Sequence, residues 1–216
     1  MDATRVAISS GHSTKCQGAI GPEPWGLNEV AEATRVADRV AEYLEMVGVD
    51  APVFHDTAST SSSQNLERIV DWHEEQGCEF NLSIHFNAFG PVEGTRGVEV
   101  LWYRDDCEQH AEEMSAAIAL AACLPDRGPK FRDDLTFLLE VKHALLIEVC
   151  FVDAHGDVDA YRQQFEDICI AIASVVSGVT MTTPAAKPVV TVSIDCPDGV
   201  DLAIIVNGVG VLLPED

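Results

Sequence analysis

Two histidines and one glutamate stand where a metal site could form. His12 follows a Ser-Gly pair at the end of the first predicted strand, and His85 lies near the end of a later one. Glu148 interrupts an otherwise apolar strand. Because ligand sites of open α/β sheets gather at the carboxyl ends of strands, these three side chains could meet around a first-row metal ion. Zinc is the ion that such a ligand set favours.

A catalytic zinc ion commonly takes three protein ligands and keeps one position open. Glu29 lies in the first turn of the helix that follows the His12 loop, where it could point back toward the strand ends and supply the third ligand. Glu23 and Cys16 lie in the same loop and compete for this role, and Cys16 would make a softer site. The residue types alone leave these alternatives open.

The carboxyl group of Glu148 is the strongest single signal. It stands within the run Leu-Leu-Ile-Glu-Val-Cys-Phe-Val. An ionised carboxylate in such surroundings loses its hydration, and this costs free energy unless the group gains a partner or a proton. One interpretation is a catalytic acid or base whose pKa is raised by burial. The other is a buried ion pair with an arginine such as Arg35.

The elements that would position these residues alternate along the chain. Apolar residues at three- and four-residue spacing predict helices over about 28–46, 64–76, 108–123 and 157–176. Strands are predicted over 5–9, 49–54, 78–88, 98–103, 135–139 and 144–152. This alternation predicts an α/β fold, with a mostly parallel central sheet flanked by helices on both faces.

Charge and composition exclude several classes of protein. The 216 residues carry 36 acidic and 13 basic side chains, a formal net charge of −23. Such a chain lacks the cations that phosphate binding requires, so we expect no nucleic-acid partner. The longest apolar run, residues 116–124, is too short to cross a bilayer, so we expect no membrane insertion. The 7 cysteines form no Cys-x-x-Cys pair, which argues against a zinc finger.

The composition changes after Gly178. Residues 1–178 would form the catalytic domain, and the Pro- and Thr-rich residues 179–188 predict a linker. Residues 189–216 alternate apolar side chains with turn signals at positions 197–199 and 207–208, which predicts a short C-terminal β-hairpin appendage. So short a segment cannot bury a core of its own. It could pack on the main domain, belong to a longer chain, or join two copies in a homo-oligomer.

The order of these motifs resembles one family. Over roughly residues 5–177, the chain is similar to zinc-dependent N-acetylmuramoyl-L-alanine amidases of the Amidase_3 type. The segments that carry the resemblance are VAISSGH (6–12), GLNE (26–29), LSIHFNA (82–88), GVEVLWY (97–103) and ALLIEVCFVD (144–153).

The resemblance implies both a metal site and a reaction. It makes His12, Glu29 and His85 the ligands of one zinc ion, and Glu148 the catalytic residue. The implied reaction is hydrolysis of the amide between N-acetylmuramic acid and the L-alanine that starts the stem peptide of bacterial peptidoglycan. The appendage at 189–216 would then be a small or truncated wall-binding element.

The chain departs from the family pattern at three places. Ser13 stands where the family usually has glycine, Lys142-His143 where it often has proline, and Cys150 where glycine is common. These departures bear on loop shapes and substrate contacts more than on the metal ligands. We expect His143 to lie exposed at a strand edge rather than in the site.

The residues before the first predicted strand show no secretion-signal pattern, so we expect a protein made without one. A wall amidase without one fits a phage endolysin, which stays in the host cytoplasm until lysis and then reaches the cell wall. Two other functions compete: a zinc peptidase of another family and a non-catalytic wall-binding module. Carboxypeptidase-like enzymes pair the first histidine with a glutamate three residues on, where this chain has Lys15. A binding module has no need of a desolvated Glu148.

Overall fold

The computed structural model describes residues 3–182, 203–206 and 209–212. They fall in two compact units, Met1–Thr183 and Pro184–Asp216. The strands of the first unit are β1 (Val6–Ser13), β2 (Val53–Asp56), β3 (Phe80–Asn87), β4 (Val98–Trp102), β5 (Asp126–Phe131) and β6 (Ala144–Phe151). Its helices are α1 (Glu29–Met46), α2 (Ser62–Gln76), α3 (Glu108–Ala122), α4 (Thr136–Glu140) and α5 (His155–Ser177), with a short 3₁₀ turn at Asp105–Cys107.

The six strands form one sheet in the order β2-β1-β3-β6-β4-β5. Strands β2, β1, β3 and β6 run parallel to one another, whereas β4 runs antiparallel to β6 and parallel to β5. The prediction of a mostly parallel sheet is therefore confirmed. The carboxyl ends of β1, β3 and β6 come to the same edge of the sheet, where the predicted site residues stand.

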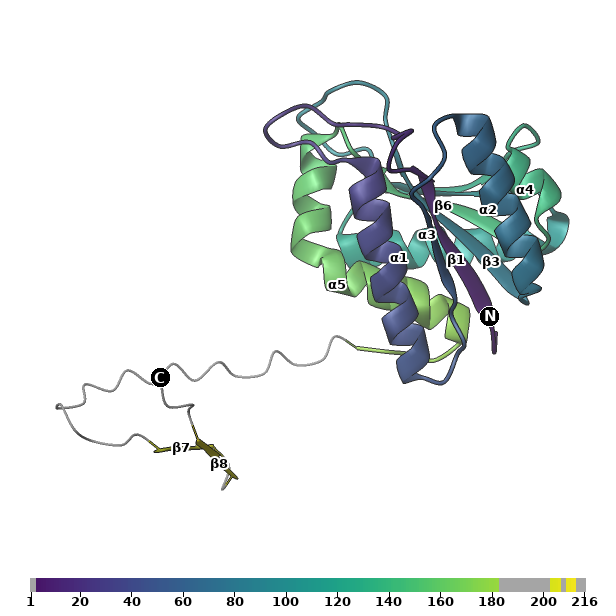
Figure 1. The fold of residues 1–216 in the computed structure, drawn as a ribbon. Coiled ribbons are helices and arrows are strands. Elements are labelled where there is room, and N and C mark those ends of the chain that lie inside the picture. The colour runs from purple at the N-terminus through teal and green to yellow at the C-terminus, as the bar shows by residue number, and fades with distance from the viewer. Residues whose placement is uncertain (1–2, 183–202, 207–208, 213–216) are drawn as a thin grey trace. The chain divides into compact units, whose positions relative to one another are not determined.

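Helices cover both faces of this sheet, as predicted (Figure 1). Helices α1, α3 and α5 pack on one face, with α5 in contact with both α1 and α3, while α2 and the short α4 cover the other face. No helix in the described part of the chain is both long and apolar enough to cross a membrane.

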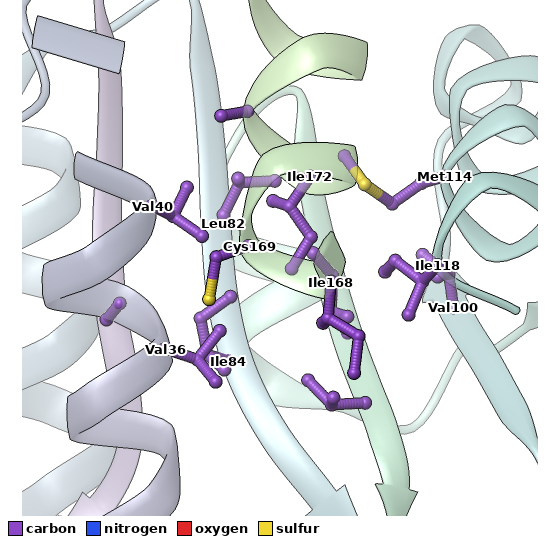
Figure 2. Close-up of a cluster of buried hydrophobic side chains, with 14 of the residues drawn as sticks. Val36, Val40, Leu82, Ile84, Val100, Met114, Ile118, Ile168, Cys169 and Ile172 are labelled. Atoms are coloured by element: carbon purple, nitrogen blue, oxygen red, sulfur yellow. The ribbon is translucent and has the colours of Figure 1, made fainter. Parts of the chain in front are cut away.

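The larger hydrophobic core lies between the sheet and helices α1, α3 and α5 (Figure 2). It forms because side chains alternate between the two faces of a strand. On β3, Leu82 and Ile84 are fully buried in this core, and removing either side chain to alanine would cost about 2–5 kcal/mol. A smaller core lies under α2 and α4 and contains Ile69, Val70, Leu101, Phe137, Leu138, Val141, Ala144 and Leu146.

The structure corrects one predicted strand and adds another. Residues 135–139 do not form a strand, because Thr136–Glu140 is helix α4, whose Phe137 and Leu138 are both buried in the smaller core. The sixth strand is instead β5, with the sequence Asp-Arg-Gly-Pro-Lys-Phe. Its charged residues, glycine and proline hide the strand pattern, and they are tolerated because β5 is an edge strand.

Two strand boundaries also differ from the prediction. Strand β1 continues beyond residue 9 to Ser13, so His12 lies within the strand rather than in the loop that follows. Strand β2 begins at Val53, after Pro52, instead of at residue 49.

The second unit contains β7 (Ala203–Val206) and β8 (Val209–Leu212), which pair as an antiparallel hairpin. The predicted turn signals at 197–199 and 207–208 lie outside the described residues, as does most of the predicted linker at 179–188.

Candidate metal centre and catalytic carboxyl group

Three predicted ligands meet at the carboxyl edge of the sheet. The Nε2 atom of His12 lies 3.3 Å from Oε1 of Glu29, and Nδ1 of His85 lies 3.0 Å from the same oxygen. The two imidazole rings meet edge to face, with centroids 5.1 Å apart. Within the described residues, these three side chains form a cluster whose ligand atoms all lie within 4.8 Å of one another.

Local structure explains how each side chain arrives there. His12 has a φ angle of 64°, a left-handed conformation that bulky residues rarely adopt and that is common at functional sites. Asn28 caps helix α1 by accepting a hydrogen bond from the backbone N–H of Ala31. This cap sets Glu29 at the first helical position. His85 lies on the face of β3 opposite the larger core.

Two glycines make room for the cluster. A Cβ atom at Gly11 would lie 2.0 Å from the His85 ring, and one at Gly18 would lie 2.1 Å from Oε2 of Glu29. Real Cβ atoms do not approach other atoms this closely, so only glycine fits at either position. The loop and the strand thus close around the three ligands without a side chain in between.

Further hydrogen bonds fix the orientation of the ligands. The backbone N–H of Ala19 donates to Oε2 of Glu29 at 2.6 Å, and that of Phe86 donates to Oε1 at 3.2 Å. The second ring nitrogen of His85, Nε2, lies 3.1 Å from the hydroxyl of Ser83. Such outer contacts select the tautomer and ring orientation of metal-binding histidines.

The electrostatics of the cluster favour an ionised Glu29. Burial raises the pKa of this carboxyl group, but hydrogen bonds and charge from His12 and His85 outweigh it, and the net pKa is well below its usual range. In turn, the hydrogen bond to Glu29 raises the pKa of His12. A negative oxygen facing two imidazole nitrogens is therefore the stable arrangement here.

Glu148 lies beside this cluster on the neighbouring strand. Its backbone pairs with His85 across β3 and β6, so both side chains lie on the same face of the sheet. Burial raises the pKa of Glu148 to about 8, and the charges of Glu29 and Glu99 add to the shift. Within the described residues, its buried Oε2 has no hydrogen-bond partner.

The alternative ion pair between Glu148 and Arg35 is wrong, because Arg35 pairs with Glu32 on α1. The other candidate ligands lie outside the cluster. Glu23 is exposed, and the sulfur of Cys16 lies 3.6 Å from the hydroxyl of Ser62. His143 pairs with Asp106 at 2.9 Å and is half-exposed.

A cavity of about 380 Å³ opens over the site between the sheet and helices α2 and α4. His12, His85 and Glu148 all line it, together with Arg132. Its remaining walls combine polar groups with a largely apolar lining from Leu66, Ile69, Leu101, Leu135, Phe137 and Leu146.

Two charged residues of this region, Glu99 and Arg132, were not predicted from the sequence. Glu99 pairs with Glu148 across β4 and β6 and is held by Asn87 and Arg127, both at 2.7 Å. It interrupts an apolar strand just as Glu148 does, so the same signal could have revealed it. Arg132 follows β5, and nothing in the pattern around it indicates that it lines the cavity.

The residues present fit a zinc ion. Two imidazole nitrogens and one carboxylate oxygen are the ligand set of several catalytic zinc sites, and the two glycines leave the space between them free. A buried carboxyl group next to such a cluster, within a cavity, is the arrangement expected of a metal-dependent hydrolase.

Comparison with known proteins places the chain in a family. The model of the N-acetylmuramoyl-L-alanine amidase family matches residues 6–178. The chain therefore belongs to this family of enzymes.

Two solved structures illustrate the likeness. The catalytic domain of the CD27L endolysin targeting Clostridia difficile has a TM-score of 0.74 and 22% identity, covering 83% of this chain and 99% of that one. The amidase AmiC2 of Nostoc punctiforme has a TM-score of 0.69 and 26% identity, covering 80% and 94%.

Curated relatives match less completely. An uncharacterized protein of Clostridium perfringens is 28% identical over 168 residues, which are 76% of this chain and 48% of that protein. The chain thus spans about half the length of the curated relatives it matches.

Proposed function

We propose that this chain hydrolyses the amide bond between N-acetylmuramic acid and the first L-alanine of the peptidoglycan stem peptide, with one zinc ion bound by His12, Glu29 and His85. The observation that carries the proposal is the carboxyl group of Glu148, whose Oε2 atom is buried without a partner among the described residues, in a cavity that the two histidines also line. The family of the chain supports the choice of substrate.

Each residue has a distinct task in this reaction. A bound zinc ion supplies the Lewis acidity that polarises the amide carbonyl group and makes water more acidic. Glu148 takes a proton from the attacking water and gives it to the nitrogen of the leaving L-alanine. A carboxyl group with a pKa near 8 suits both transfers near neutral pH, because it readily changes its protonation state there.

Variants separate metal binding from proton transfer. His12→Ala and His85→Ala should lose zinc, measured by elemental analysis of the purified protein. Glu148→Gln should keep zinc and lose about 10²–10⁴-fold in turnover, the usual contribution of a general acid or base. The control is Glu74→Gln, an exposed position on α2. Stoichiometric zinc in both histidine variants would refute the ligand assignment. Near wild-type turnover of Glu148→Gln would show that Glu148 is not the general acid and base.

The assay also decides between classes of protein. Mass spectrometry of digested walls detects free L-alanine amino termini on stem peptides if the chain is an amidase. A zinc peptidase would release other termini. A wall-binding module would sediment with walls and release none.

We further propose that the protein acts in cell lysis as a phage endolysin, held in the host cytoplasm until it reaches the wall. The family of the chain and the likeness of its fold to the catalytic domain of the CD27L endolysin support this role. Expression in a bacterial host with and without a membrane-permeabilising protein tests it. Lysis only when the membrane is opened is the expected result, and lysis without opening contradicts it.

The predicted homo-oligomer through residues 189–216 is checked by light scattering of the full chain.

A further inference from the structure

The cavity over the site holds one arginine. Among the described residues that line it, Arg132 is the only lysine or arginine, while Glu148 and Asp134 are acidic. The chain as a whole has 36 acidic and 13 basic residues. Because the protein is so acidic, this positive charge in the cavity is the group that could attract an anionic part of a substrate.

Asp134 fixes the orientation of Arg132. Its two carboxylate oxygens accept hydrogen bonds from Nε at 2.7 Å and from Nη2 at 3.0 Å. This two-point contact occupies one edge of the planar guanidinium group and leaves the edge formed by Nη1 and Nη2. Within the described part of the chain, no group accepts a hydrogen bond from Nη1, and the side chain is 40% exposed.

Arg132 acts on the same space as the catalytic carboxyl group. Its positive charge lowers the pKa of Glu148, which partly offsets the effect of burial. The hydrogen bond with Asp134 is the main cause that raises the pKa of Arg132, and the charge of Glu148 adds to it. The two side chains are thus within electrostatic range of each other in one cavity. In an extended peptide, successive residues are about 3.3–3.6 Å apart. A stem peptide with its first amide at Glu148 therefore comes near Arg132 within a few residues.

We propose that Arg132 binds a free carboxylate on the peptide half of the substrate through its open Nη1–Nη2 edge. The inference rests on the proposed amidase function and adds a specificity to it. The enzyme prefers stem peptides that carry an ionised carboxyl group close to the scissile amide, and it discriminates against stems in which that group is amidated. A carboxylate matches the fork of an arginine at two points, whereas a carboxamide offers only one acceptor.

One polymer in two chemical forms tests the proposal. Purified sacculi are used as prepared, or after their carboxyl groups have been converted to amides with a carbodiimide and ammonium. The initial rate of appearance of L-alanine amino termini is measured for both. Wild-type protein should cleave the untreated form tenfold faster or more, the size expected for a charge-assisted pair. In Arg132→Gln this ratio should fall close to one, mainly through slower cleavage of the untreated form.

Arg162→Gln is the matched control, because it removes one positive charge from an exposed position of α5 and should keep the wild-type ratio. Circular dichroism checks that both variants are folded. Equal wild-type rates on the two forms would overturn the inference, as would an unchanged ratio in Arg132→Gln. Absence of new L-alanine termini from either form with wild-type protein contradicts the amidase function itself.

Discussion

The buried carboxyl group of Glu148 should make the metal-free protein less stable as the pH rises. In the folded protein its pKa is about 8, against an ordinary value of 4.5. Between these values the folded state holds a proton that the unfolded state has lost. The free energy of unfolding therefore falls as pH rises through this window. Glu148→Gln, which is neutral at every pH and nearly the same shape, removes this dependence.

The size of the effect follows from the two pKa values. At about 1.4 kcal/mol for each pH unit between them, the ceiling is about 5 kcal/mol. Rearrangement and water entry around the ionised carboxylate reduce such penalties, so we expect Glu148→Gln to gain ~2–3 kcal/mol over wild type on going from pH 5 to pH 9. At pH 5 the two proteins should be of similar stability.

Urea unfolding of wild type and variant at pH 5, 7 and 9 measures this difference. Both proteins are kept in chelator, because a metal bound only by the folded state would add its own stabilisation. Groups that titrate equally in the two proteins cancel from the comparison. The exposed control Glu74→Gln should show no such trend. Parallel pH profiles for Glu148→Gln and wild type would refute the assignment of a strongly desolvated carboxyl group to this position.

Three further outcomes are expected. Gly18→Ala should weaken zinc binding, seen by competition with a coloured chelator, because its methyl group would displace the Glu29 carboxylate; unchanged affinity would contradict the packing. His73, whose pKa is lowered to about 4 by burial, makes wild type lose stability as pH falls from 6.5 to 4, since only the unfolded chain gains the proton there. His73→Phe should flatten this acid limb while costing about 1–3 kcal/mol at neutral pH through the lost hydrogen bonds with Ser9 and Asn81. A chain ending at Thr182 should unfold cooperatively and remain soluble, because both hydrophobic cores lie before that residue; an insoluble product would disprove this.

Simple alternation predicted much of the sheet and part of the site. The apolar side chains of β3 and the polar ones between them placed His85 on the face away from the larger core, as the structure shows. Glu148 could be predicted as a site residue because it is the one carboxyl group in the apolar strand β6. Both inferences work because a strand has a fixed side-chain period, so the sequence states which residues share a face.

Other parts of the site depend on contacts that no local pattern records. The left-handed conformation of His12 and the fit of Gly18 against Glu29 arise from loop closure over the sheet edge. Strand β5 is held by pairing with β4, not by apolar residues of its own, so its sequence does not resemble a strand. Arg132 follows this strand, and its place in the cavity could therefore not be predicted.

The two faces of the sheet divide stability and chemistry between them. The face under α1, α3 and α5 carries the apolar side chains of β1, β3, β4 and β6 that form the larger core. Among the described helices, α2 and the five-residue α4 cover the opposite face, and the carboxyl ends of β3 and β6 open into a cavity there. There the alternation sets His85, Glu148 and Glu99 side by side across three strands. Placing three ionisable groups side by side lowers the stability of the folded state, and the larger core on the other face of the sheet offsets this loss. A cavity-forming substitution in the larger core, such as Ile84→Ala, should consequently lower the free energy of unfolding by about 2–5 kcal/mol and yet leave zinc stoichiometry intact. Loss of zinc at a temperature where that variant is still folded would show that the two faces are not independent.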